Sequence, residues 1–261
     1  MKKLYIIKIG GNIIDDEVKL SSFLDKFSVI RDHKILVHGG GKLATGVAEA
    51  MNIPQEMIDG RRITDAETLK VVTMVYAGSV NKNIVAALQA KHCNALGLSG
   101  ADGNSILSHK RMHPVTDYGF VGDVDAINAP LISLLLQQDI SLVFAPLTHD
   151  AKGTLLNTNA DTIAQELAKG MSSLYDVSLI YCFEKNGVLR NADNDNSVIP
   201  AITLSSFMQM KKAGTISDGM IPKLQNAFSA LDAGVRSVCV GHADKLDLLI
   251  KNESGTLMEH E

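Results

Sequence analysis

Two stretches of the sequence decide the fold: Leu4-Tyr5-Ile6-Ile7-Lys8-Ile9-Gly10-Gly11 and Ile35-Leu36-Val37-His38-Gly39-Gly40-Gly41-Lys42. In each, a short aliphatic run that is typical of a strand buried on both faces ends in glycines. Glycine lets the backbone turn sharply and come close to a ligand, so consecutive N–H groups can point at an anion. A lysine stands beside each glycine run. The two stretches together indicate a site that handles phosphate.

The composition indicates a folded protein without a large surface of one charge. The chain has 261 residues, 46% of them hydrophobic, which suits one large α/β domain or two smaller lobes. Its net charge of −4, from 25 basic and 29 acidic residues, gives no electrostatic footprint for nucleic acid or an anionic membrane. The first apolar run is too short for a signal peptide or a spanning helix, so we expect a soluble cytoplasmic protein.

The cysteines and histidines do not indicate a metal site. Cys93, Cys182 and Cys239 are widely spaced and form no C-x-x-C pair, so we expect them to be small core residues. His109 and His113 stand four residues apart, but outside any expected helix and without a carboxylate motif. No protein ligand to a metal is therefore assigned.

Short apolar segments alternate with segments of helical periodicity along the chain. The apolar segments, bounded by polar residues or glycine, are expected to be strands: residues 4–9, 34–38, 95–98, 140–144, 177–182 and 237–240. The periodic segments are expected to be helices: residues 17–27, 44–51, 65–91, 129–138, 161–171, 204–212 and 221–231. This alternation predicts an α/β fold with an open, mostly parallel sheet sandwiched between helices.

Two stretches break this alternation. Residues 105–124 alternate apolar and polar side chains around Asp117-Tyr118-Gly119, which predicts a β-hairpin at the rim. Residues 185–200 are rich in Asn, Asp and Gly, which is the composition of turns. No Pro/Ser-rich linker or repeat divides the chain. We therefore expect one domain, residues 1–261, made of two lobes that share one sheet and meet near residue 172.

The first glycine run has two interpretations when it is taken alone. Lys8 near a strand end is costly to bury without an anion, and open α/β sheets bind ligands at the carboxyl ends of their strands. Alternatively, Lys8 extends to solvent before an ordinary turn. The second run favours a binding site, because it opens a helix whose N–H groups and dipole attract an anion. Neither run matches a P-loop or a dinucleotide fingerprint. His38 is interpreted as structural, since nothing calls for proton transfer.

Two later segments place polar residues where helices begin. In Asn157-Thr158-Asn159-Ala160-Asp161, Asn159 can cap the helix and Asp161 can complement its dipole. The carboxylate can also orient lysines that come from other strand ends. Lys223, near the start of the helix expected at 221–231, opposes the helix dipole. This placement suggests a local anion, although a solvent-facing lysine is the simpler alternative.

A fourth segment, Gly60-Arg61-Arg62-Ile63-Thr64-Asp65, combines arginines with a helix start. Thr64 or Asp65 is expected to be an N-cap. An arginine can hold a substrate carboxylate through two parallel hydrogen bonds, which a lysine cannot do. One of the two arginines can equally be a surface charge.

These motifs occur in an order that resembles acetylglutamate kinases, of the amino-acid kinase superfamily. The resemblance spans nearly the whole chain. Besides the two glycine runs, it rests on Gly60-Arg61-Arg62-Ile63-Thr64, Asn81-Lys82, Gly119-Phe120-Val121-Gly122-Asp123-Val124, Asn157-Thr158-Asn159-Ala160-Asp161 and Asp218-Gly219-Met220-Ile221-Pro222-Lys223. The lysine-glycine motif also occurs in carbamate kinases, aspartokinases, uridylate kinases and glutamate 5-kinases. The Gly-Arg-Arg-Ile-Thr, Phe-Val-Gly-Asp-Val and Asn-x-Asn-Ala-Asp elements together are specific to acetylglutamate kinases.

The resemblance implies phosphoryl transfer from MgATP to the γ-carboxylate of an N-acyl-L-glutamate, giving an acyl phosphate for arginine biosynthesis. N-acetyl-L-glutamate is the expected substrate, with N-succinyl-L-glutamate as the alternative. A carboxylate with a pKa of about 4.3 is already ionised at neutral pH, so its attack needs no general base. The transfer needs charge compensation and in-line positioning. Another carboxylate or carbamate kinase, or a catalytically inactive amino-acid sensor, remains an alternative.

The resemblance also assigns roles to residues. Lys8 and Lys223 would lie along the phosphoryl path from opposite sides, with Asp161 holding both ammonium groups. The N–H groups of Gly11, Gly40 and Gly41 would bind the transferring phosphoryl group and the attacking carboxylate. Arg62 and Asn157 would fix the α-carboxylate of the substrate, and Asn159 would support Asp161 and the ligand network. The residues assigned to the acylglutamate are therefore Gly40, Gly41, Arg62, Asn157 and Asn159. Further nucleotide contacts are expected at Gly10, Glu184, Gly187, Gly219 and Met220. Mg²⁺ would be held mainly by nucleotide phosphates and water.

The resemblance places the acylglutamate in a lobe of residues 1–172 and the nucleotide in a lobe of residues 173–261. In the nucleotide loop, Phe183-Glu184-Lys185-Asn186-Gly187-Val188-Leu189, Glu184 stands where the family usually has aspartate, so the adenine and ribose contacts are not fixed by the resemblance. Arginine-inhibited members carry a helix before the first strand, whereas this sequence reaches its first strand at once. We therefore expect an arginine-insensitive homodimer that binds small-molecule substrates.

Overall fold

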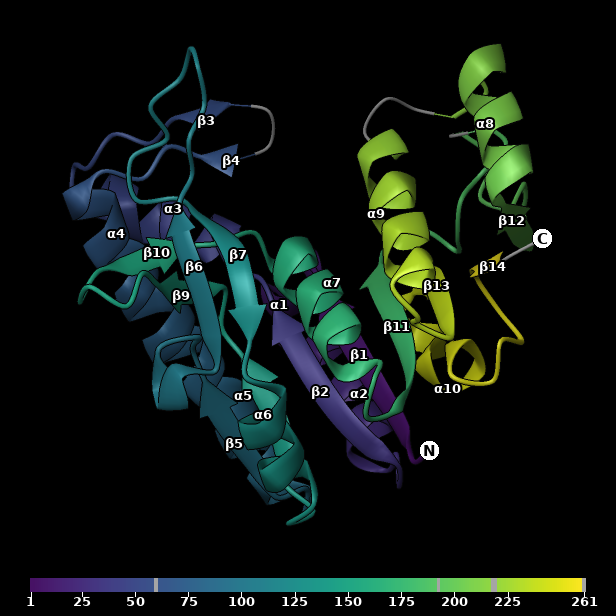
Figure 1. Cartoon of the computed structure of the whole chain (residues 1–261), viewed down its shortest axis with the longest axis horizontal. Coiled ribbons are helices and arrows are strands. Elements are labelled where there is room, and N and C mark those ends of the chain that lie inside the picture. Colours follow the sequence, from purple (N-terminus) through teal and green to yellow (C-terminus); the bar gives the residue numbers. More distant parts are fainter. Residues whose placement is uncertain (59–60, 192, 217–219, 260–261) are drawn as a thin grey trace.

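An eight-stranded sheet forms the centre of the computed structural model, which describes residues 1–58, 61–191, 193–216 and 220–259 (Figure 1). The strand order is β12-β14-β13-β11-β1-β2-β8-β5. The six expected strands are confirmed as β1 (Lys3–Ile9), β2 (His33–His38), β5 (Ala95–Leu98), β8 (Ser141–Phe144), β11 (Asp176–Phe183) and β13 (Ser237–His242), and they pair in parallel. Two unexpected short strands, β12 (Ala201–Thr203) and β14 (Thr256–Glu259), extend one edge, where β14 is antiparallel to β13.

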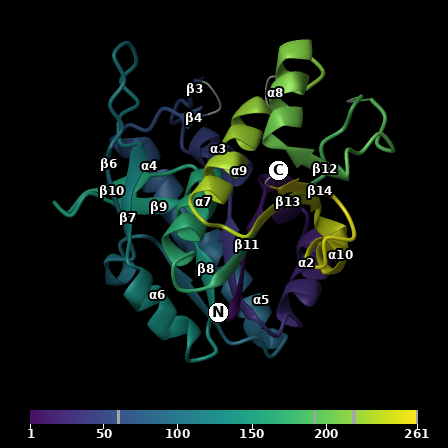
Figure 2. The ribbon, with the colours of Figure 1, turned by 45° about the vertical axis from the view of Figure 1, so that its right-hand side comes forward.

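Helices cover both faces of this sheet, as the sequence predicts. One layer contains α6 (Ala129–Leu136), α7 (Ala160–Met171), α8 (Leu204–Ala213) and α9 (Ile221–Asp232). The other contains α2 (Glu17–Ser28), α3 (Gly41–Ala50), α4 (Ala66–Val72), α5 (Asn81–Ala90) and α10 (Leu246–Leu249). Figure 2 separates the layers: α7 and α9 lie to one side of β11 and β13, and α2 and α10 lie to the other.

The side chains of β1 and β2 alternate between the two layers, because successive residues of a strand point to opposite faces. Leu4 and Ile6 pack in the layer of α7, whereas Tyr5, Ile7 and Ile9 pack in the layer of α5. By the same alternation Lys8 faces α7. The alternation therefore sends the functional side chains of the central strands to two different helix layers.

The helix expected at residues 65–91 is a single helical stretch, but its middle has a different winding. A π-helix, η1 (Thr73–Val80), separates α4 from α5. The stretch Ala66–Ala90 is long and apolar enough to cross a membrane by length and composition. Val71, Val72, Ile84 and Leu88 in it are fully buried against the sheet, as in the core helix of a globular domain.

The expected hairpin is confirmed by β6 (Ile106–Lys110) and β7 (Gly122–Ile127), which pair antiparallel. It belongs to a small second sheet with β9 (Leu147–His149) and β10 (Leu155–Asn157), two strands that the sequence pattern does not predict. A two-stranded ribbon joins β3 (Met57–Ile58) to β4 (Arg61–Arg62). The remaining short elements are α1 (Gly11–Ile14) and the 3₁₀ turns η2 (Asp102–Asn104) and η3 (Ala243–Lys245).

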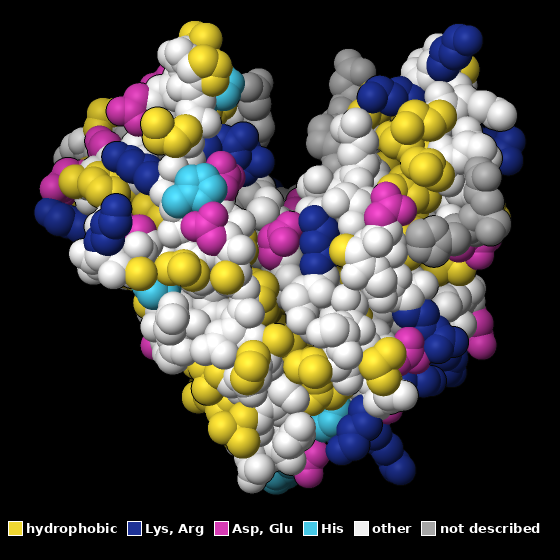
Figure 3. Space-filling model, in the orientation of Figure 1, with side chains coloured by type: hydrophobic (Ala, Val, Ile, Leu, Met, Phe, Trp, Pro, Cys, Tyr) yellow, Lys and Arg dark blue, Asp and Glu magenta, His cyan; other side chains and the backbone are white. Residues whose placement is uncertain are grey.

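The expected turn region at residues 185–200 contains no strand or helix among its described residues, apart from the bridge between Leu189 and Val198. The molecular surface is deeply notched between two upright parts (Figure 3). The small sheet, α3 and α4 belong to one part, and α8, α9, β12 and β14 belong to the other (Figure 1). The carboxyl ends of the parallel strands lead into the region between them.

Candidate active site

The two glycine runs lie side by side, because β1 and β2 are neighbours. Ile9 is paired with His38, so the two runs leave the sheet at the same level. Helix α1 begins at Gly11, and α3 begins at Gly41. The first N–H groups of a helix have no acceptor inside it, so both runs present backbone donors at the carboxyl ends of β1 and β2. Gly40 has φ +147°, a conformation that side chains rarely allow.

Lys8 and Asp161 form an ion pair beside these glycines. Lys8 Nζ lies 2.7 Å from Asp161 Oδ1, and the two side chains are 17% and 22% exposed. Burial raises the pKa of Asp161, but the charge and hydrogen bond of Lys8, together with the charge of Lys223, outweigh it and bring the pKa below its usual value. The carboxylate is therefore ionised at neutral pH and holds the Lys8 ammonium at the strand end.

Asn159 takes the capping role that the sequence offered as one interpretation. Its Oδ1 accepts hydrogen bonds from the N–H groups of Asp161 and Thr162, at 2.8 and 3.1 Å, and so begins α7. Asp161 lies in the first turn, where its charge also complements the helix dipole. The cap fixes the position from which Asp161 reaches Lys8.

Lys223 lies in α9, with its ammonium 5.4 Å from the centre of the Phe183 ring. Asp161 forms its ion pair with Lys8, while the exposed Lys223 side chain lies over the aromatic face. The implied arrangement, in which Asp161 holds both ammonium groups, stays a prediction. Lys223 nevertheless lines a hollow together with Gly10, Gly11 and Glu184, so it faces the same space as the first glycine run.

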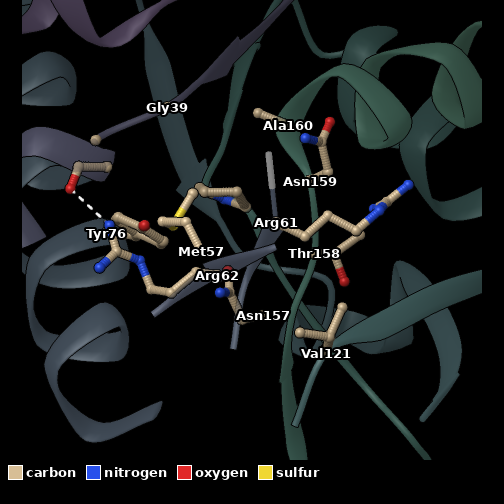
Figure 4. Close-up of a pocket in the computed structure, with 13 residues that line it drawn as sticks. Gly39, Met57, Arg61, Arg62, Tyr76, Val121, Asn157, Thr158, Asn159 and Ala160 are labelled. Atoms are coloured by element: carbon tan, nitrogen blue, oxygen red, sulfur yellow. Dashed lines mark hydrogen bonds between the residues drawn. The ribbon is translucent and has the colours of Figure 1, made fainter. Parts of the chain in front are cut away.

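A pocket of about 620 Å³ opens beside the second glycine run (Figure 4). It brings together all five residues that the resemblance assigns to the acylglutamate: Gly40, Gly41, Arg62, Asn157 and Asn159. In Figure 4, Tyr76 and Arg62 lie on one side of the pocket, and Thr158 and Asn159 lie on the other. The residues meet although β4, β10 and the starts of α3 and α7 are far apart in the sequence.

Arg62 is held in place by neutral acceptors. Its Nη2 donates to the carbonyl of Gly41 and to Thr45 Oγ1, each at 2.9 Å, and its Nη1 donates to Gln55 Oε1. Opposite, Asn157 Nδ2 donates to Thr64 Oγ1 at 3.0 Å. Because none of these acceptors carries a charge, the positive charge of Arg62 is available to an anion in the pocket.

Arg61 also lines this pocket, where the sequence offered one of the two arginines as a surface charge. Burial, with repulsion from Arg111, lowers the pKa of Arg61. Arg111 pairs with Asp123 at 2.7 Å, and within the described ranges Arg61 has no ion pair of its own. Met57, Tyr76 and Val121 are further lining residues that sequence reasoning missed. For Arg61, the sequence signal was its position next to Arg62.

A second pocket of about 590 Å³ lies in the later part of the chain. It contains two of the expected nucleotide contacts, Gly187 and Met220, together with Phe183. Glu184 instead lines the hollow of Gly10, Gly11 and Lys223. Gly219, also expected to contact the nucleotide, lies outside the described residues. Phe183 borders both spaces, so the pocket and the hollow adjoin at the carboxyl end of β11.

The arrangement suits the transfer of an anionic group between two ligands. Backbone donors, Lys8 and Lys223 supply positive potential, and an arginine pocket lies on one side with a partly apolar pocket on the other. No cluster of three or more His, Cys, Asp or Glu residues that could hold a metal occurs in the described part of the chain. The donor set fits polyphosphate oxygens, which accept hydrogen bonds from N–H and ammonium groups.

Comparison with known proteins identifies the class. The sequence profile of the amino acid kinase family matches residues 3–242. The chain therefore belongs to the amino acid kinase family. A solved structure, that of smu.665 from Streptococcus mutans UA159, has a TM-score of 0.81 at 28% identity and covers 99% of both chains.

Within the family, the chain is similar to acetylglutamate kinases over its whole length. The acetylglutamate kinase of Phocaeicola vulgatus is 56% identical over 258 residues, covering 99% of both chains. That of Cytophaga hutchinsonii is 54% identical, covering 98% of this chain and 97% of its own. The resemblance that the sequence motifs indicated is thus confirmed.

Proposed function

We propose that the protein transfers the γ-phosphoryl group of ATP to the γ-carboxylate of N-acetyl-L-glutamate, giving an acyl phosphate for arginine biosynthesis. The similarity to acetylglutamate kinases over 99% of the chain supports this proposal. The structural observation that carries it is the Lys8–Asp161 ion pair, at a strand end between the glycine donors and a pocket that contains Arg62 and Asn157.

In this proposal, Arg62 and Asn157 hold the α-carboxylate of the substrate, and its γ-carboxylate points toward Gly40 and Gly41. The nucleophile is already ionised, so the protein has no proton to remove. Lys8 and the glycine N–H groups stabilise the charge that spreads over the phosphoryl group during transfer. Asp161 keeps the Lys8 ammonium at the transfer point.

Lys223, Gly10, Gly11, Glu184, Gly187 and Met220 are proposed to contact the nucleotide. This assigns residues 1–172 to the acylglutamate lobe and residues 173–261 to the nucleotide lobe. Lys223 lies over the ring of Phe183 and lines the same hollow as Gly10 and Gly11, and we propose that its ammonium contacts the phosphates of ATP there. Mg²⁺ would be held through the nucleotide phosphates, where it would neutralise part of their charge.

We also propose a cytoplasmic homodimer. Strand β5 is an edge of the large sheet, and Leu96 in it is 37% exposed. An edge strand presents unpaired backbone N–H and C=O groups, with which a strand of another chain can pair. Light scattering coupled to gel filtration tests this directly, since the monomer mass is 28.0 kDa. A single peak at the monomer mass at micromolar concentration would rule the dimer out.

One observation favours N-succinyl-L-glutamate as a second candidate substrate. The positive charge of Arg61 lines the acylglutamate pocket without an ion pair of its own among the described residues. A succinyl group ends in a carboxylate, which can accept two charge-assisted hydrogen bonds from this guanidinium, whereas an acetyl group ends in a methyl group, which can accept none. Substitution of Arg61 therefore distinguishes the two candidate substrates.

The test is ATP-dependent hydroxamate formation with each substrate, because hydroxylamine captures an acyl phosphate. We expect hydroxamate to form with N-acetyl-L-glutamate, and no hydroxamate with either substrate would refute the kinase proposal. If Arg61 binds a succinyl carboxylate, Arg61→Met should raise the KM for N-succinyl-L-glutamate roughly tenfold or more and leave that for N-acetyl-L-glutamate nearly unchanged. An equal effect on both substrates would reject the second candidate.

A further inference from the structure

His38, at the end of β2, is fully buried and makes two hydrogen bonds that the proposed chemistry does not explain. Its Nδ1 lies 2.7 Å from the carbonyl oxygen of Gly39, and its Nε2 lies 3.1 Å from Nδ2 of Asn81. A carbonyl oxygen can only accept, so the proton of the ring is on Nδ1. Nε2 then accepts from the Asn81 amide. The two neighbours together select one neutral tautomer.

Both polar atoms of the Asn81 side chain make hydrogen bonds. Its Nδ2 also donates to the carbonyl of Val143, at 2.9 Å, and its Oδ1 accepts from Lys82 Nζ at 3.1 Å. A Cβ atom at Gly97, in β5, would collide with Asn81 Oδ1. The chain therefore has glycine in a strand position where it leaves room for this one amide.

The π-helix η1 brings Asn81 to this place. The N–H of Asn81 bonds to the carbonyl of Tyr76, five residues earlier, which is the π-helical pattern. Tyr76 packs against Gly40, where an added Cβ would stand 3.0 Å from its ring. Tyr76 and Asn81 thus support the second glycine run at two points, one by packing and the other through His38.

The bond from His38 to Gly39 sets the direction of a donor in the active site. The C=O of Gly39 and the N–H of Gly40 belong to one planar trans peptide, in which they point in opposite directions. When His38 holds the carbonyl, the Gly40 N–H is turned to the other side. No acceptor for this N–H is found among the described residues, and Gly40 lines the acylglutamate pocket.

We propose that His38 and Asn81 are a pair of positioning residues that aim the Gly40 N–H at the reacting carboxylate and phosphoryl group. The inference rests on the proposed function only for the identity of the ligand. His38 does not exchange a proton during turnover, and its burial lowers its pKa to about 4, which keeps it neutral at physiological pH.

Kinetics of five variants test the pair. His38→Leu removes both bonds, and Gly97→Ala displaces Asn81 while leaving His38 intact. Both should lower kcat about 10-fold to 100-fold, with the KM for ATP and for the acylglutamate changed less than about threefold, because a misdirected donor weakens the transition state more than the bound substrates. His38→Asn keeps an amide donor near the position of Nδ1 and should restore most of the lost kcat.

Two control variants separate positioning from stability. Lys34, at the other end of β2, is buried and donates to the carbonyls of Phe27, Ser28 and Ile30 at 2.8 to 2.9 Å. Lys34→Met should lower the melting temperature without lowering kcat. Gly46→Ala, where a Cβ meets open space inside α3, should leave kcat unchanged and should not lower the melting temperature, because alanine is the better helix former. A wild-type kcat in His38→Leu, or an equal loss of kcat in Lys34→Met, would overturn the proposal.

A readout without turnover keeps the proposal independent of the substrate. In protein labelled with ¹⁵N-histidine, NMR between pH 6 and 8 should show His38 neutral, protonated at Nδ1, and unprotonated at Nε2. An Nε2–H tautomer or an imidazolium would overturn the proposal even if His38→Leu does not fold. A wild-type protein that phosphorylates no acylglutamate but shows the Nδ1–H tautomer would instead refute the proposed function and leave the pair intact.

Discussion

Replacing Lys8 by methionine tests the ion pair at the centre of the site. The substitution keeps most of the side-chain volume but removes the ammonium 2.7 Å from Asp161. If Lys8 stabilises charge on the transferring phosphoryl group, its loss should cost about 2.7–4 kcal/mol of transition-state stabilisation, the range seen when one such donor is removed. We therefore expect kcat to fall roughly 100-fold to 1,000-fold.

The same substitution should reduce the free energy of unfolding. The two side chains are only 17% and 22% exposed, so the pair lies between a surface ion pair, worth up to about 1 kcal/mol, and a buried one, whose disruption costs about 3–5 kcal/mol. We expect a loss of about 1–3 kcal/mol at pH 7.

This loss of stability should depend on pH. The pKa of Asp161 is lowered in the folded state, so its contribution is fully present above the ordinary value of 3.8 and is lost as the pH falls through the folded-state value. Without Lys8, burial keeps the pKa higher. The difference in unfolding free energy between wild type and Lys8→Met should thus be largest above the raised pKa that Asp161 has in the variant, and should shrink as the pH falls from that value toward the lowered pKa of the wild type.

The assays are initial rates with both substrates saturating and urea unfolding followed by circular dichroism. Lys26→Met is the matched control, because Lys26 pairs with Asp247 at 3.1 Å on the exposed surface. It should leave kcat unchanged and alter the unfolding free energy by less than about 1 kcal/mol. A Lys8→Met enzyme with kcat within tenfold of wild type, or a stability difference that persists undiminished at low pH, would refute the reasoning.

Three further predictions concern the pockets and the core. Arg62→Lys should raise the KM for the acylglutamate about tenfold or more and leave the KM for ATP unchanged, since lysine cannot make the paired bonds of a guanidinium; steady-state kinetics showing equal changes in both would contradict this. Gly40→Ala should lower kcat more than about tenfold, because φ is +147° there, with Gly46→Ala as the neutral comparison. Burial raises the pKa of the Cys182 thiol, and raises that of Cys239 to about 12, so iodoacetamide at pH 8 should leave both unmodified in the folded protein, and rapid labelling seen by mass spectrometry would be inconsistent with the structure.

The central sheet was predictable because its strands carry strong local signals. The apolar runs of β1 and β2 are continuous and end in glycines, so their type, direction and ligand-binding ends follow from the residues alone. Strands β9 and β10 have three residues each. They exist because the hairpin of β6 and β7 provides a partner, and a three-residue segment carries no pattern of its own.

The site was predictable in its charged and glycine residues, and less so in the residues that hold them. Burying a charged side chain costs free energy unless it has a partner, so charged residues next to strand or helix ends indicate a site in the sequence. Lys8, Asp161 and Arg62 are such residues. Tyr76 and Asn81 lie in a stretch of helical periodicity, and their role depends on the π-helical turn, which periodicity does not reveal. Arg61 was ambiguous because its surroundings, Arg111 and Asp123, come from a distant hairpin.

The central claim, direct transfer of the γ-phosphoryl group to a side-chain carboxylate, has a decisive isotope test. The γ-carboxylate of N-acetyl-L-glutamate is labelled with ¹⁸O, and the product formed with ATP is captured with hydroxylamine, which attacks the carbonyl carbon and releases phosphate. The account predicts one ¹⁸O atom from the substrate in each released phosphate, in a yield equal to that of the hydroxamate. Phosphate that carries no ¹⁸O, or that forms without hydroxamate, would contradict it.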